Sequence, residues 1–148
     1  MIKKCLISIF LLFFLLNCSS NKKSSEKTEI INDSKILYVE AMSYFENEQY
    51  DLALNSFNEI RKIYPLSNEA IQSQIMSAFI DYIRLRYDEA IYKFDIIINN
   101  NPSLKNIDYV YYMKAVCYYE QIQHEELDGE NNLLALKYLN EVIERFPD

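Results

Sequence analysis

Apolar residues recur every three or four positions along most of the chain after residue 33, which is the spacing of helices with one buried face. This pattern predicts six helices, over residues 34–47, 51–63, 67–85, 88–99, 107–123 and 132–146. Ser34, Ser67 and either Asn106 or Asp108 stand where a helix N-cap is expected. We therefore expect an all-α fold made of three helical hairpins.

Several residue types recur 37 positions apart. The first members of this pattern are Ala41, Tyr50, Ala53, Phe57 and Pro65, and the second are Ala78, Tyr87, Ala90, Phe94 and Pro102. A two-helix unit with these features resembles the tetratricopeptide repeat, in which small residues let two helices approach and a proline closes the second helix. The resemblance implies a superhelix of three hairpins over residues 34–148, with repeats at about 34–65, 67–102 and 107–147.

The third repeat has eight more residues between its helices than the other two repeats have. This insertion holds His124 and the carboxylates Glu125, Glu126, Asp128 and Glu130. Such residues can bind a metal, but the segment has a single histidine and lacks the ligand spacing of a calcium loop. We therefore expect a solvated acidic loop, without a metal or a cofactor.

Composition excludes several classes of function. Beyond its first 17 residues the chain carries 13 basic and 22 acidic residues, so nucleic acid is not an expected partner. Its single glycine rules out a glycine-rich phosphate loop, and no set of residues is arranged for nucleophilic catalysis. Cys117 lies in an apolar run and is expected to be buried rather than reactive. We expect a protein that is not an enzyme.

Residues 1–17 have the pattern of a signal peptide. A short basic start precedes an apolar run over residues 6–16, which is too short to cross a bilayer. The run ends in Leu-Leu-Asn-Cys and resembles a lipobox, the site at which bacteria acylate a cysteine and cleave before it. We therefore expect lipidation at Cys18, although position 17 usually carries Gly, Ala or Ser and here carries Asn.

The polar residues 18–33 are expected to form a flexible tether behind the lipidated cysteine. Ser19 follows the cysteine, where lipoproteins retained in the inner membrane usually carry Asp, so the pattern indicates the outer membrane. One alternative is an ordinary secretory signal in which Cys18 is incidental, and another is a short uncleaved anchor.

The first helix of each hairpin lines the concave face in repeat stacks of this kind, and here that face is aromatic and apolar. The residues expected to form a peptide-binding groove are Tyr38, Met42, Phe45, Tyr64, Ile75, Phe79, Tyr82, Tyr109, Tyr112, Val116 and Tyr119. Such a groove suits an extended or helical peptide with aromatic anchors. The alternative is that many of these side chains pack between neighbouring repeats.

Residues 106–114 (NIDYVYYMK) are the most specific stretch of the chain. With the lipobox, the tether and the 37-residue repeats, they make residues 18–148 resemble the BamD family of outer-membrane lipoproteins. The resemblance implies a non-catalytic scaffold of the β-barrel assembly (BAM) complex, anchored in the outer membrane and facing the periplasm. Its implied partners are BamA, other subunits of the complex, and unfolded outer-membrane proteins that carry an aromatic C-terminal signal.

A hypothesis of a different class is a periplasmic adaptor lipoprotein, which uses the same repeats to recruit envelope or cell-wall enzymes. The BamD family has about five repeats, and repeat arrays normally end in a polar capping helix. Here the last predicted helix would leave Leu136, Leu139, Ile143 and Phe146 partly uncovered. We therefore expect these residues to be the N-terminal part of a longer repeat array.

Overall fold

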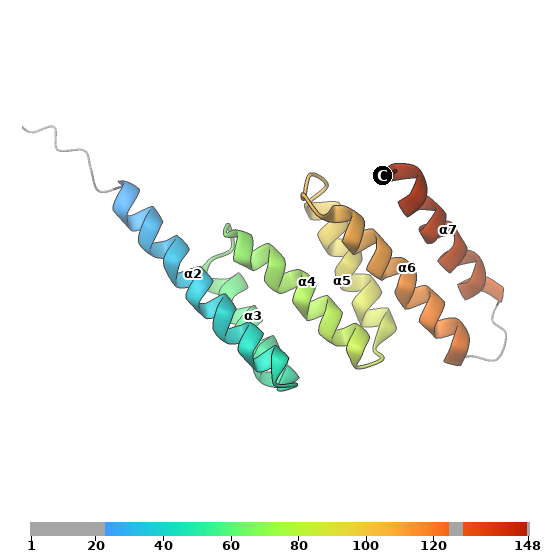
Figure 1. The fold of residues 1–148 in the computed structure, drawn as a ribbon, viewed down its shortest axis with the longest axis horizontal. Helices are drawn as coiled ribbons and strands as arrows, with labels where there is room; N and C mark the ends of the chain where they lie inside the picture. Colours follow the sequence, from blue (N-terminus) through green and yellow to red (C-terminus); the bar gives the residue numbers. More distant parts are fainter. Residues whose placement is uncertain (1–22, 125–128, 148) are drawn as a thin grey trace, which may run out of the picture. The chain divides into compact units, whose positions relative to one another are not determined.

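The computed structural model describes the backbone of residues 23–124 and 129–147, with side chains within residues 33–121 and 132–147. The helices of this part are α2 (Lys23–Glu46), α3 (Tyr50–Ile63), α4 (Asn68–Ile83), α5 (Tyr87–Asn100), α6 (Ile107–His124) and α7 (Gly129–Arg145) (Figure 1). No strand occurs among the described residues, and the all-α prediction is confirmed. Five of the six helices begin and end within three residues of the predicted bounds.

Helix α2 is the exception, because it begins at Lys23, eleven residues before the predicted start. Residues 23–33 were expected to precede the first helix, within the tether, whereas the structure includes them in α2. The segment is polar, but it contains no Gly or Pro, and its Glu and Lys residues are good helix formers. Residues 18–22, the leader and Cys18 lie outside the described residues.

Of the two serines predicted to cap helices, Ser67 does so and Ser34 does not. Ser67 caps α4, and its hydroxyl accepts a hydrogen bond from the backbone N–H of Ala70 at 3.0 Å. Ser34 is buried inside α2 rather than at its start, and its hydroxyl donates to Oε2 of Glu69 at 3.0 Å. This bond joins α2 to the first turn of α4. Helix α6 begins at Ile107, so Asn106 occupies the predicted N-cap position, whereas Asp108 lies inside the first turn and is not the cap.

The two helices of hairpins one and two are joined by the same turn. Glu48 and Leu85, which are 37 residues apart, both have a left-handed backbone, with φ of 58° and 59°. In each loop this residue and the next donate their N–H groups to carbonyls in the last turn of the preceding helix, at 2.9–3.0 Å. This geometry is typical of a helix C-terminus that usually carries glycine at the left-handed position.

The recurring small and aromatic residues form the core, as the repeat pattern predicts. Six of them have no exposed surface: Ala41, Ala53, Phe57, Ala78, Ala90 and Phe94. One buried cluster links α2, α3 and α4, and a second links α4, α5 and α6. Each phenylalanine fills the space beside two alanines, where neighbouring helices approach closely.

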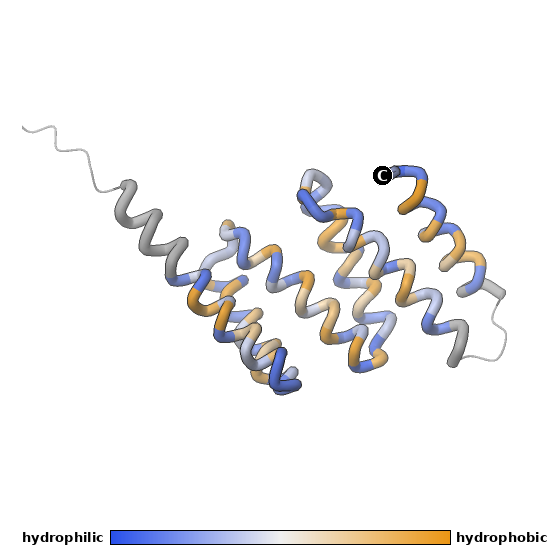
Figure 2. Tube along the Cα trace, in the orientation of Figure 1, coloured by the Kyte–Doolittle hydropathy of each residue, from blue (hydrophilic) through white to orange (hydrophobic). Residues whose placement is uncertain are grey.

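Within residues 33–148, each helix from α3 onward contacts the next one in the sequence, and α4 also contacts α6. The first helices of successive hairpins therefore lie side by side, which is the arrangement of a tetratricopeptide-like stack. In Figure 2, hydrophobic and hydrophilic segments alternate along α4, α5 and α7. Such alternation is expected of helices that have one apolar side, as the sequence pattern predicts.

Helix α7 has one apolar side that the described residues do not cover. Leu136 and Ile143 are 58% and 69% exposed, and Leu139 and Phe146 are partly exposed, as predicted; the ring of Phe146 also contacts Tyr111, with ring centroids 5.5 Å apart. Among the described helices, none combines the length and the apolar character that a membrane span requires.

Candidate functional site

Helix α6 presents an exposed aromatic stripe. Tyr109, Tyr112, Val116 and Tyr119 follow one another at spacings of three, four and three residues, which places them on one side of the helix. The three tyrosines are 41%, 48% and 49% exposed, and Val116 is half-buried. Exposed aromatic side chains gathered on one helix face are typical of a surface that binds a partner.

Equivalent positions of the three hairpins carry aromatic rings. Phe45 on α2, Tyr82 on α4 and Tyr119 on α6 are separated by 37 residues each. The ring of Phe79 connects the first two hairpins, with its centroid 6.1 Å from that of Phe45 and 5.8 Å from that of Tyr82. These separations lie within the favourable range for aromatic pairs. The stack therefore places its rings in a continuous row from α2 to α4.

Tyrosines from the second helices support this row from behind. The ring of Tyr50, at the start of α3, lies 5.8 Å from Phe45, and that of Tyr87, at the start of α5, lies 5.9 Å from Tyr82. Both are the tyrosines of the repeat motif. Their role in the motif is therefore to hold the rings of the preceding helix in place.

Besides burial, charged and phenolic groups of α6 raise the pKa of a tyrosine on α4. The pKa of the Tyr82 phenol is raised by burial, and further by Glu120 and by neighbouring groups that include Tyr112. Burial and Glu120 raise the pKa of Tyr87 in the same way. Both phenols are therefore neutral at physiological pH, and each can donate a hydrogen bond. We call the set Phe45, Phe79, Tyr82, Tyr109, Tyr112, Val116 and Tyr119 the aromatic face.

Three predicted groove residues pack within the hairpins instead. Ile75 is 7% exposed and belongs to the core cluster between α4, α5 and α6, which is the packing role named as the alternative to a groove. Tyr38 contacts the buried Phe57 with ring centroids 5.8 Å apart, and Met42 packs against the same cluster. Ile75 is thus buried in the core, whereas Tyr38 and Met42 are partly buried and pack against the core cluster beside α3.

Tyr64 lies away from the aromatic face. It follows α3, and its N–H caps that helix by donating to the carbonyl of Ile60 at 2.8 Å. The connection leads into the N-terminal end of α4, whereas Phe79 and Tyr82 lie near its C-terminal end. At 1.5 Å per residue, the two ends are roughly 20 Å apart.

Glu120 is the residue of this face that the sequence prediction missed. It follows Val116 by four residues and Tyr112 by eight, so helical spacing alone places it beside the stripe. The prediction selected apolar and aromatic residues and therefore passed over a carboxylate at the same face.

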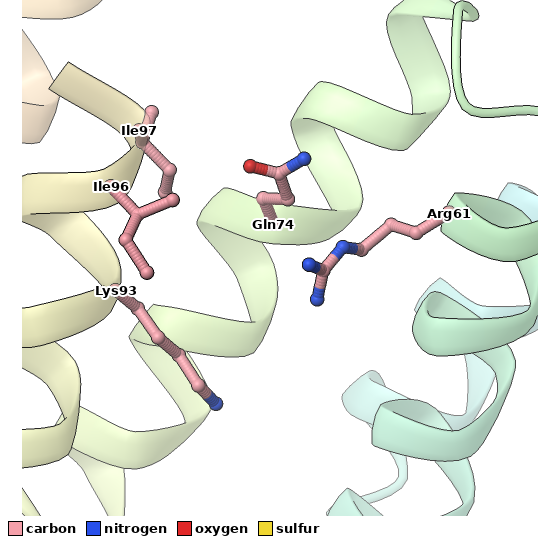
Figure 3. A pocket seen from close by; sticks show the side chains of 5 residues that line it. All are labelled: Arg61, Gln74, Lys93, Ile96 and Ile97. Carbon is pink, nitrogen blue, oxygen red and sulfur yellow. The ribbon is translucent and has the colours of Figure 1, made fainter. Parts of the chain in front are cut away.

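Two further hollows lie among the described residues. The first is a pocket of about 40 Å³ lined by Arg61, Gln74, Lys93, Ile96 and Ile97 (Figure 3). Its cations are already engaged: Lys93 forms an ion pair with the buried Asp81, and Arg61 donates to Asn58 at 3.3 Å. The second is an open hollow along the connection between α5 and α6. Neither includes a residue of the aromatic face.

Cys117 has no exposed surface, which confirms the prediction of a buried thiol. Burial, followed by the charge of Glu120, raises its pKa to about 12, so it remains a protonated thiol at physiological pH. Within the described residues, no three His, Cys, Asp or Glu side chains gather where a metal ion could bind. The predicted acidic loop is not tested, since residues 125–128 and the side chains of 122–131 lie outside the description.

Comparisons with known proteins point to one family. The family model YfiO, described as "Outer membrane lipoprotein", matches residues 31–148. Proteins named outer membrane protein assembly factor BamD are similar: that of Rickettsia prowazekii is 28% identical over 131 residues, and that of Caulobacter vibrioides is 29% identical over 114. These alignments cover 88% and 77% of this chain, but 51% and 37% of the relatives.

A third relative, the protein of that name from Neisseria meningitidis serogroup B, is 24% identical over an alignment of 158 residues. It matches 99% of this chain and 59% of its own length. The chain thus spans about half the length of the curated relatives that it matches.

Proposed function

Since the chain belongs to the YfiO family of outer membrane lipoproteins, we propose that it is a non-catalytic scaffold for the assembly of outer-membrane β-barrel proteins. One observation carries the proposal: the aromatic face extends over the first helices of all three hairpins, and its tyrosines on α6 are about half exposed. The names of the relatives support the process. In this proposal the aromatic face receives unfolded barrel proteins, and the scaffold binds BamA and other subunits of the complex.

The chemistry of the face matches the chemistry of such a substrate. Strands of outer-membrane barrels alternate apolar and polar residues and carry aromatic rings at both membrane interfaces. Before insertion these rings are exposed, and stacking against Tyr or Phe contributes about 0.5–1.5 kcal/mol per pair beyond the burial of area. A few such contacts give a moderate affinity, which suits a receptor that passes its substrate on.

We further propose that the scaffold is held at the outer membrane, facing the periplasm, by acylation of Cys18 after removal of residues 1–17. The motif Leu-Leu-Asn-Cys and the apolar run before it support this assignment. Intact-mass measurement of the mature protein tests it. We expect an N-terminal Cys18 carrying acyl chains, and a mature chain that starts elsewhere or lacks the lipid would contradict the anchor.

Photo-crosslinking to a peptide from a barrel C-terminus, ending in an aromatic residue, tests the binding face. Replacing Phe79 or Tyr112 by Ala is expected to weaken crosslinking about fivefold, since each change removes one aromatic contact. Tyr92→Ala is the matched control, because Tyr92 is 67% exposed but lies on α5, away from the face. Equal crosslinking of all variants, with unchanged helicity, would disprove the assignment.

Affinity purification of the full chain from detergent-solubilised membranes tests the partner. We expect BamA in the isolate. Its absence, together with the presence of an envelope or cell-wall enzyme, would favour the adaptor hypothesis over the assembly scaffold.

A further inference from the structure

Glu120 is a half-buried carboxylate that no basic group of the described chain neutralises. Its neighbour Gln121 donates to Oδ1 of Asp88 at 2.8 Å, whereas Glu120 itself forms no hydrogen bond or ion pair within the described residues. After burial, the charge of Glu120 contributes to the raised pKa of Tyr82, Tyr87 and the buried Cys117. Among the side chains that the structure describes, Glu120 therefore has no counter-ion.

Three cations, just after the end of α4 and on α6, form ion pairs with other carboxylates. Arg86 pairs with Asp81, Arg84 pairs with Asp51 at 2.9 Å, and Lys114 pairs with Asp95 at 2.6 Å. Each of these carboxylates is on another helix than Glu120. The negative charge at the aromatic face is therefore available to a ligand.

Rings and a carboxylate together form a receptor for a cation. A Lys or Arg side chain is attracted to the faces of aromatic rings, and a charge-assisted hydrogen bond to a carboxylate strengthens the contact. Glu120 follows the half-exposed Tyr112 by eight residues on α6, so both side chains lie on one side of the helix, and the charge of Glu120 contributes, after burial, to the raised pKa of Tyr82 on α4. An anionic group at the same place is repelled.

We infer that Glu120 makes the aromatic face select peptides in which a Lys or Arg side chain stands next to an aromatic anchor. The inference rests on the proposed function, because it names the peptide chemistry preferred by the same face. It assigns Glu120 a role in specificity, while the aromatic anchor provides most of the affinity.

Binding of three synthetic peptides to the full chain, measured by fluorescence anisotropy, tests this inference. The peptides are identical except for Lys, Gln or Glu next to one Phe, and their C-termini are amidated. We expect the Lys peptide to bind about fivefold more tightly than the Gln peptide, and the Glu peptide more weakly than either. High salt should reduce the difference between Lys and Gln.

The variant Glu120→Gln assigns the effect to its source. We expect it to bind the Lys and Gln peptides equally, while the control Glu59→Gln, an exposed change on α3, keeps the difference. Loss of the difference in both variants, or in neither, would overturn the role of Glu120. If Glu120→Gln does not fold, as judged by circular dichroism, the three peptides with wild-type protein still show whether the face prefers a cation.

The failures of the two proposals are distinguishable. Equal binding of all three peptides to the wild-type chain overturns the charge selectivity and leaves the aromatic face as a binding site. No binding of any of the three overturns the peptide-binding function itself, and the selectivity with it.

Discussion

The ring of Phe45 on α2 and the ring of Phe79 on α4 lie 6.1 Å apart, with their planes inclined by 46°. Neither residue belongs to the fully buried core, yet this contact joins the exposed faces of two successive hairpins. The rings thus contribute to the packing of the stack and to the surface that we propose binds peptides. Mutations on the aromatic face therefore differ in how far they affect stability and binding.

Replacing Phe79 by Ala should affect both properties, and replacing Tyr112 by Ala should affect binding alone. Phe79 loses ring contacts to Phe45 and Tyr82, so we expect the free energy of unfolding to fall by about 2 kcal/mol. Tyr112 is half exposed, and its loss should cost less than about 0.5 kcal/mol. Urea denaturation followed by circular dichroism measures both changes. Equal losses of stability would contradict the difference in packing.

Replacing Asp81 by Asn should destabilise the second hairpin. The carboxylate of Asp81 is 3% exposed and pairs with Arg86 and Lys93, which join the end of α4 to α5. Loss of the charge leaves two partly exposed cations without their partner, and we expect a cost of about 2 kcal/mol in urea denaturation. Asp51→Asn is the matched control, because Asp51 is 84% exposed in its pair with Arg84 and should change stability by less than about 0.5 kcal/mol.

Replacing Leu85 by Gly should stabilise the chain, although it removes an apolar side chain. Leu85 is 62% exposed and has a φ of 59°, a conformation that glycine adopts without steric cost. We expect a gain of about 0.5–1 kcal/mol in the free energy of unfolding. Leu66→Gly should instead destabilise, since Leu66 is fully exposed but its φ is negative. A loss of stability in both variants would refute the argument from backbone strain.

The buried thiol of Cys117 predicts a specific pH dependence. Its pKa rises from an ordinary value of 9.0 to about 12 in the folded chain, so ionisation favours the unfolded state. This contribution to stability is present below pH 9 and is lost as the pH rises towards 12. The difference in unfolding free energy between wild type and Cys117→Ala should therefore shrink by about 1–2 kcal/mol between pH 8 and pH 10.5. A constant difference would show that the thiol ionises equally in both states.

The helices were largely predictable because their positions follow from patterns of residues that are close together in the sequence. Five of six were found within three residues, since the apolar period and the 37-residue repeat of Ala, Tyr and Phe are visible in the sequence. The start of α2 was missed because a polar segment with good helix formers has no apolar period to reveal it. The left-handed turns at Glu48 and Leu85 were not predictable, because neither position carries the glycine that usually marks them.

The aromatic face was only partly predictable. Helical spacing selected the tyrosines of α6, which the structure leaves about half exposed, but it also selected Ile75, which packs into the core. Spacing along one helix tells which residues share a side, but not whether a neighbouring helix covers that side. The same limit applies to Glu120, whose position beside Tyr82 and Tyr87 depends on how α4, α5 and α6 pack.

The sequence by itself determined the helical repeats, the identity of the core alanines and phenylalanines, and the family, because these depend on residue type and on spacing along the chain. Tertiary structure alone decided which aromatic rings pack into the core and which stay exposed, and it left the carboxylate of Glu120 without an ion-pair partner among the described side chains. Burial and electrostatic contact are properties of residues that are distant in sequence. They arise only when the hairpins stack, and the stacking brings residues of α2, α4 and α6 onto one face.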